Sequence, residues 1–144
     1  ELDPGKLSNE DKEEIKKQIA TFRKHYDLIQ NGKYYRLSEI KEDYYEAWQF
    51  ASEDGSEALL NVVVTSPQPN PTLMNIKLKG LEPGAVYEMT DESEEYHVES
   101  FYKDTSDNAG RRVFSGDALM NAGYTLPWAF GDYPAYQLHF RKIR

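Results

Sequence analysis

The sequence predicts a mainly β protein, an antiparallel β-sandwich of about eight strands preceded by one long amphipathic α-helix. Two observations support this fold class. Apolar residues recur with a helical period before residue 33, and from Lys33 onward they alternate with a period of two. Eight short strand-like stretches then follow one another with regular turns, which is typical of a sandwich. At 144 residues the chain fits one domain that can hold its own core.

The helix is predicted over residues 9–30. Ser8 and Asp11 form an S-x-x-D capping box at its start, and Asn31-Gly32 supplies a left-handed stop at its end. Spacings of four and three place five large side chains on one face, namely Ile15, Ile19, Phe22, Tyr26 and Ile29. Burying such side chains contributes about 1.5–3 kcal/mol each. The face must therefore be covered, either by the protein's own sheet or by a neighbouring domain that is absent here.

Strands are predicted at residues 34–37, 45–52, 57–65, 73–79, 85–90, 96–102, 111–114 and 135–141. The run Ala58–Val64 is apolar on both sides, as expected of a central strand that is covered on both faces. We expect the helix of residues 9–30 to cover its second face. Glu53–Ser56 suits a hairpin turn, and Pro83-Gly84 suits a type II turn.

The composition disfavours several classes of protein. With no cysteine, the chain has no disulfide framework, no zinc–thiolate site and no thiol nucleophile, and an intracellular, cytoplasmic origin is favoured. The net charge of -8 disfavours nucleic acids and anionic membranes as partners. No apolar run approaches the length of a bilayer span. The chain has no initiator methionine, and Glu1–Gly5 looks like the interior of a sequence, which indicates a segment of a longer protein.

The histidines give no sign of a metal site. His25, His97 and His139 lie far apart in the sequence, and none has the spacing of a metal-binding motif. We expect each to be a surface or edge residue rather than a ligand. Residues 104–110 have the composition of a calcium loop but lack its alternating acidic residues and distal glutamate. No metal site and no cofactor site is therefore predicted.

No catalytic residue is predicted either. Ser115 and Asp117 flank a glycine, but no G-x-S-x-G context makes the serine a nucleophile. We expect one of the two to cap the short helical turn that follows, which Gly123 ends. A glycosidase needs two carboxylates facing each other across a cleft, and nothing in the sequence singles out such a pair.

Aromatic side chains are frequent, with two Trp, eleven Tyr and six Phe. Aromatic residues on strands usually fill a sandwich core, and we expect this of most of them. Exposed rings can instead stack on sugars. Trp128, in a loop between Pro127 and Gly131, is the best candidate for this role, and Trp48 is a second. An autonomous carbohydrate-binding module is therefore an alternative function.

Three stretches, in the same order along the chain, resemble parts of one known family. Residues 1–37 contain the helix and the stretch D-L-I-Q-N-G-K-Y-Y-R-L; Leu78–Tyr87 reads L-x-G-L-x-P-x-x-x-Y; and Phe114–Pro127 reads F-S-G-D-A-L-M-N-A-G-Y-T-L-P, followed by Gly131-Asp132-Tyr133. Together they resemble the C-terminal end of bacterial family 36 α-galactosidases. Residues 91–112 depart from this pattern because they are longer than expected between the last two motifs, so the role of that loop stays open.

The resemblance implies that residues 1–32 are the terminal helix of an otherwise absent catalytic (β/α)8 barrel, and that residues 33–144 are a C-terminal β-sandwich domain. It implies retaining hydrolysis of terminal α-galactosides such as melibiose and raffinose, with one aspartate as nucleophile and another as acid/base. Both aspartates belong to barrel motifs that precede this segment. The chain alone is therefore expected to be inactive and to stabilise the barrel by packing on it. An oligomerisation domain that pairs two copies through an exposed apolar surface is a further alternative.

Overall fold

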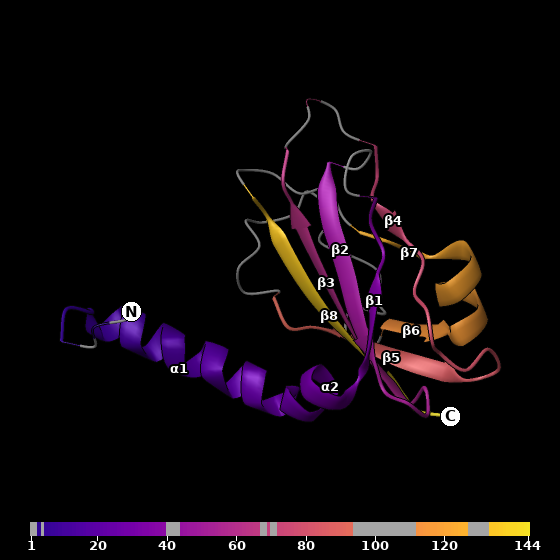
Figure 1. The fold of residues 1–144 in the computed structure, drawn as a ribbon, viewed down its shortest axis with the longest axis horizontal. Coiled ribbons are helices and arrows are strands. Elements are labelled where there is room, and N and C mark those ends of the chain that lie inside the picture. Colours follow the sequence, from indigo (N-terminus) through magenta and orange to yellow (C-terminus); the bar gives the residue numbers. More distant parts are fainter. Residues whose placement is uncertain are drawn as a thin grey trace.

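A helical arm leads into a sandwich of two unequal sheets (Figure 1). This computed structural model describes residues 3, 5–39, 44–66, 69, 72–93, 112–126 and 133–144. The helices are α1 (Asn9–Lys24), α2 (Tyr26–Asn31) and the π-helix η2 (Ala118–Ala122). The strands are β1 (Lys33–Arg36), β2 (Tyr45–Ala51), β3 (Glu57–Val64), β4 (Asn75–Ile76), β5 (Val86–Asp91), β6 (Arg112–Ser115), β7 (Tyr124–Thr125) and β8 (Ala135–Lys142). None of the helices in these ranges is long and apolar enough to cross a membrane.

The larger sheet has the strand order β1-β2-β3-β8-β5-β6, and every neighbouring pair is antiparallel. The C-terminal strand β8 thus lies in the middle, between β3 and β5. The smaller sheet is the antiparallel pair β4–β7. The predicted fold class, an antiparallel sandwich preceded by a helix, is confirmed.

One face of the larger sheet carries the hydrophobic core. Alternate residues of β3 and β8 point into it, as the period of two predicts. Its most deeply buried members are at most 1% exposed and include Leu60, Val62, Tyr87, Leu138 and Phe140. A buried polar side chain in the same face, Gln49, bonds to the backbone N–H and C=O of Lys79, so its amide oxygen and nitrogen each have a partner.

The second layer is built from β4, β7 and η2. Only two residues of the strand predicted at 73–79 pair with another strand, because the N–H of Leu78 donates to the carbonyl of Leu119 in η2 instead. The partner of β4 is β7, which the sequence pattern did not predict. Leu78, Leu119 and Leu126 close the core from this side and are each 1% exposed.

The predicted helix is interrupted. The capping box is confirmed, since Ser8 and Asp11 bond to each other's backbone N–H. A single helix over residues 9–30 is wrong, because the chain leaves α-helical geometry at His25, between α1 and α2. The left-handed stop is also wrong, since Gly32 is extended with a φ of -71°. A glycine is needed there for close approach, because a Cβ atom would lie 2.2 Å from the carbonyl oxygen of Leu28.

The second face of the larger sheet is covered by α2 rather than by the whole helix. The short helix α2 contacts β2 and β3 and buries Leu28, and Leu59 on the outer face of β3 is completely buried. Helix α1 projects away from the sandwich (Figure 1). The expectation that residues 9–30 cover this face is therefore correct for α2 and wrong for α1.

Seven of the eight predicted strands are present with shifted ends, and residues 96–102 lie outside the described residues. The hairpin turn at Glu53–Ser56 is confirmed, with Gly55 at a φ of 70° between β2 and β3. The type II turn at Pro83-Gly84 is wrong, because Gly84 does not have the positive φ that this turn requires. The N–H of Ala85 closes the turn on Glu82 instead.

Candidate functional site

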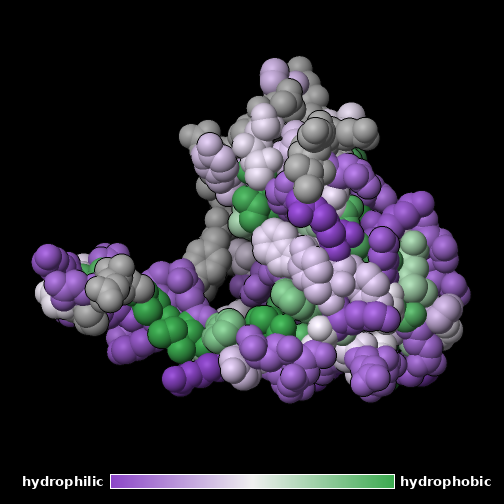
Figure 2. Space-filling model, viewed as in Figure 1, coloured by the Kyte–Doolittle hydropathy of each residue, from purple (hydrophilic) through white to green (hydrophobic). Residues whose placement is uncertain are grey.

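Helices α1 and α2 carry an apolar face that is called the helix face below. Three of its members are exposed and two, Ile15 and Ile29, are half-buried; the full set is Ile15, Ile19, Phe22, Tyr26 and Ile29. No residue of α1 is buried. Ile19, Phe22 and Tyr26 are 44%, 48% and 52% exposed, and the last two rings meet edge to face at 5.6 Å. Figure 2 shows green apolar side chains that follow one side of α1 toward the sandwich. Such a continuous apolar surface is suited to packing against another apolar surface.

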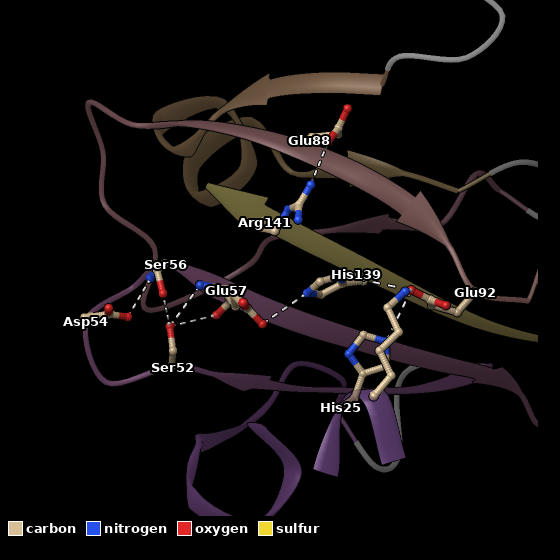
Figure 3. A network of polar contacts seen from close by, with 10 residues as sticks. His25, Ser52, Asp54, Ser56, Glu57, Glu88, Glu92, His139 and Arg141 are labelled. Carbon is tan, nitrogen blue, oxygen red and sulfur yellow. Dashed lines mark hydrogen bonds and ion pairs between the residues drawn. The ribbon is translucent and has the colours of Figure 1, made fainter. Parts of the chain in front are cut away.

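A second candidate lies where the helical arm meets the sheet (Figure 3). His25 comes from the junction of α1 and α2, Glu92 directly follows β5, and His139 lies on β8; these three form the histidine cluster. The Nε2 atom of His25 lies 3.2 Å from Oε1 of Glu92, and the Nδ1 atom of His139 lies 4.0 Å from the same oxygen. The two imidazole rings are 4.6 Å apart. In the described parts of the chain, this is the single group of three or more such residues with metal-binding spacing.

Two charged neighbours complete the surroundings of the histidine cluster. Lys24 donates to Oε1 of Glu92 at 2.5 Å, and its own side chain is half exposed. On the other side, Nε2 of His139 lies 3.3 Å from Oε2 of Glu57. Glu57 in turn begins β3, where its N–H donates to the hydroxyl of Ser52 in the adjoining turn. The cluster is therefore held by groups from four separate parts of the chain.

The electrostatics of the cluster follow from burial and from these neighbours. Burial raises the pKa of Glu92, but the ammonium of Lys24 and then His25 outweigh it and hold that pKa below its ordinary value. Burial, and then the charge of neighbouring His25, hold the pKa of His139 below its ordinary value against the opposing effect of Glu57. Both groups are therefore tuned by burial and by the charges packed around them.

The expectation that His25 and His139 are surface or edge residues is wrong, because they are 3% and 9% exposed and the strand of His139, β8, lies inside the sheet. Sequence spacing did not reveal the cluster, since its members come from the two ends of the chain and from the end of β5. His97, the third histidine, lies outside the described residues.

Ser115, the last residue of β6, has a structural role. Ser115 caps η2, because its hydroxyl accepts from the N–H of Ala118 at 3.1 Å, whereas the Asp117 side chain makes no capping bond. Gly123 ends η2 at a φ of 87°, as predicted. Trp48 lies half-buried on β2, with its side chain on the face opposite the core. Trp128 and residues 104–110 fall outside the described part of the chain.

Comparison with known proteins places these features in context. Residues 45–140 match the model of the glycosyl hydrolase family 36 C-terminal domain. The whole chain is 36% identical to a part of the bifunctional α-galactosidase/sucrose kinase AgaSK of Mediterraneibacter gnavus, and it covers 14% of that protein.

Two solved structures are similar over 99% of this chain. The α-galactosidase AgaB of Geobacillus stearothermophilus matches with a TM-score of 0.80 and 32% identity, and a variant of AgaA from the same organism in complex with raffinose matches with a TM-score of 0.79 and 30% identity. The chain covers 17% of each of these two proteins. It therefore spans less than a fifth of the length of the relatives that it matches.

Proposed function

Because this chain belongs to glycosyl hydrolase family 36, as its C-terminal domain, we propose that it is the non-catalytic end of an α-galactosidase. In this proposal residues 1–32 form the terminal helix of a catalytic barrel, and residues 33–144 form the sandwich that packs on the barrel and stabilises it. The relatives support the proposal, because this chain matches a small part of each of them.

One observation carries the proposal, which is the uncovered helix face. The described part of the sandwich has a buried core of its own, and α2 contacts the larger sheet, yet α1 extends beyond the sandwich with Ile19 and Phe22 exposed. A helix that belongs to a barrel would present this face to the neighbouring barrel helices and strands. The face thus fits one occupant, the polypeptide that precedes α1 in the relatives.

The gain from covering the helix face can be approximated. Complete burial of a large apolar side chain contributes about 1.5–3 kcal/mol. Ile19, Phe22 and Tyr26 are already about half covered, so docking on the barrel would add about 2–4 kcal/mol from these three side chains. This is a large share of the 5–15 kcal/mol that is typical of a folded domain.

For the whole protein we propose hydrolysis of terminal α-galactosides with retention of anomeric configuration. The raffinose bound to the AgaA variant supports a substrate of this class. The nucleophile and the acid/base would both be aspartates of the barrel, so no residue of this chain takes part in the reaction. The absence of cysteine supports a cytoplasmic location.

The helix face can be tested by comparing two proteins, the 144-residue chain alone and a polypeptide that also contains the preceding barrel. The double variant Ile19→Ser with Phe22→Ser should lower the free energy of unfolding of the longer protein by about 1–3 kcal/mol more than that of the chain alone. Leu73→Ser is the matched control, since this side chain is 54% exposed but lies two residues before β4 and far from the helix face in the sequence. Its effect should be the same in both proteins.

Equal losses for the double variant in the two proteins would contradict the proposal. Light scattering of the chain alone measures its oligomeric state and so tests separately whether two copies pair through the helix face. A dimer that dissociates on the double substitution would favour the oligomerisation domain instead.

A further inference from the structure

We propose that His25, Glu92 and His139 bind one divalent transition-metal ion of the zinc class, which ties the helical arm to the larger sheet. The inference goes beyond the proposed function, because it concerns only residues of this chain and does not depend on a barrel or on a galactoside.

The donor atoms already lie close to a coordination geometry. All three residues can offer ligand atoms within 4.8 Å of one another. Zinc binds imidazole nitrogen and carboxylate oxygen at about 2.0–2.2 Å, so ligand atoms at a tetrahedral site are about 3.3 Å apart. Nε2 of His25 and Oε1 of Glu92, at 3.2 Å, meet this requirement, and Nδ1 of His139, at 4.0 Å from the same oxygen, needs a shift of less than 1 Å.

The nitrogen of His25 is a second geometric sign, because its close contact with Glu92 does not have hydrogen-bond geometry. Its side chain is 2% exposed, and its Nε2 atom makes no hydrogen bond although it is buried and faces the cluster. The short distance to Glu92 therefore lacks the alignment of a hydrogen bond. A buried polar atom without a hydrogen bond is costly, and a metal ion on its lone pair would satisfy it.

Glu57 favours the tautomer of His139 that can bind a metal ion through Nδ1. A carboxylate at Nε2 holds the proton of a neutral imidazole on that nitrogen, which leaves a lone pair on Nδ1. Nδ1 is the atom that faces Glu92. This arrangement of carboxylate, histidine and ligand position is the one that surrounds metal-binding histidines in general.

Lys24 is the competitor of the metal ion. Its ammonium now neutralises Glu92 at Oε1, the same oxygen that faces both histidines. The lysine side chain is half exposed, so it can withdraw into solvent when a divalent cation takes its place. Removing the lysine charge should therefore tighten metal binding, whereas removing a ligand should abolish it.

A metal ion that links His25 to Glu92 and His139 has a structural consequence. His25 stands at the break between α1 and α2, whereas Glu92 directly follows β5 and His139 lies on the neighbouring strand β8. A metal ion bound by all three would fix the direction in which α1 leaves the sandwich. It would also stabilise the folded chain, because the unfolded chain does not bring these residues together.

The test is calorimetric titration of Zn²⁺ into the 144-residue chain, produced without a histidine tag and stripped with a chelator. We expect one ion per chain, a rise in Tm on zinc addition, and a visible absorption band when Co²⁺ replaces zinc. His25→Gln and His139→Gln should lose this binding, and Glu57→Gln should weaken it about 10–100-fold. Lys24→Met should strengthen it.

Glu88→Gln is the matched control, because Glu88 lies on β5 four residues before Glu92 but pairs with Arg141. Its zinc affinity should equal that of the unsubstituted chain. Circular dichroism shows whether each variant is folded. If a histidine variant does not fold, Lys24→Met still tests the site, because it keeps all three ligands. The inference is overturned if the unsubstituted chain shows no saturable binding, if binding survives in a folded His25→Gln or His139→Gln variant, or if Lys24→Met weakens it.

Discussion

Tyr87→Phe tests how the two turns at one end of the sandwich are held together. The Tyr87 side chain is completely buried, and its hydroxyl donates to the carbonyl of Gly55 at 2.6 Å and accepts from the N–H of Glu82 at 2.9 Å. It thereby joins the β2–β3 hairpin turn to the turn before β5. Phenylalanine keeps the ring and its packing, so the substitution isolates these two hydrogen bonds.

The expected loss follows from the surroundings of the two partners. Each hydrogen bond contributes about 0.5–1.5 kcal/mol net, and a buried acceptor left alone costs about 1–3 kcal/mol. Gly55 is buried, whereas Glu82 is exposed and its N–H can bond to water. We therefore expect a loss of about 2 kcal/mol, which corresponds to roughly 4–8 °C in Tm for a domain of this size.

Urea unfolding followed by circular dichroism measures this loss, and an unchanged m-value shows that the same surface is exposed on unfolding. Tyr34→Phe is the control, because Tyr34 is 55% exposed and its loss should stay below about 0.5 kcal/mol. A Tyr87→Phe variant as stable as this control would refute the role of the hydroxyl.

Three further predictions concern other parts of the fold. Gly116→Ala should destabilise by about 1–3 kcal/mol in urea unfolding, because the new Cβ would lie 2.1 Å from the Glu82 carbonyl oxygen, whereas Gly84→Ala, with nothing within 4 Å, should not. The bond from the Ser56 hydroxyl and then the one from its N–H lower the pKa of Asp54 to about 2. A carboxyl whose pKa is lowered in the folded state stabilises the fold at pH values above its unfolded-state pKa. The stability advantage of the unsubstituted chain over Asp54→Asn should therefore be full above about pH 5 and vanish toward pH 2. A difference that does not depend on pH would contradict this. Ser8→Ala should cost α1 about 1 kcal/mol, seen as faster amide exchange in its first turn with unchanged exchange in β3.

The features predicted correctly from the sequence are those that depend on neighbouring residues. The capping box needs only Ser8 and Asp11, and the hairpin turn needs only a glycine at a positive φ between two alternating strands. The alternation of apolar and polar residues in β8 likewise indicates which of its residues face the core. Such local patterns determined the fold class and most strand positions.

The features that were missed depend on contacts between distant segments. The strand predicted at 73–79 is shortened because Leu78 bonds to η2, and β7 has two residues, too few for a pattern. The break at His25 cannot be seen in a spacing that is helical on both sides of it. The histidine cluster exists because β5 and β8 are neighbours in the sheet, and no spacing along the sequence contains that information.

The central claim is that this chain is the non-catalytic C-terminal domain of an α-galactosidase. The most direct test is release of the chromophore from a chromogenic α-galactoside, measured for the 144-residue chain alone and for a polypeptide that also contains the preceding barrel. We predict turnover by the longer polypeptide and none above the blank by the chain alone. Turnover by the isolated chain, or a folded longer polypeptide that leaves α-galactosides intact, would contradict the account.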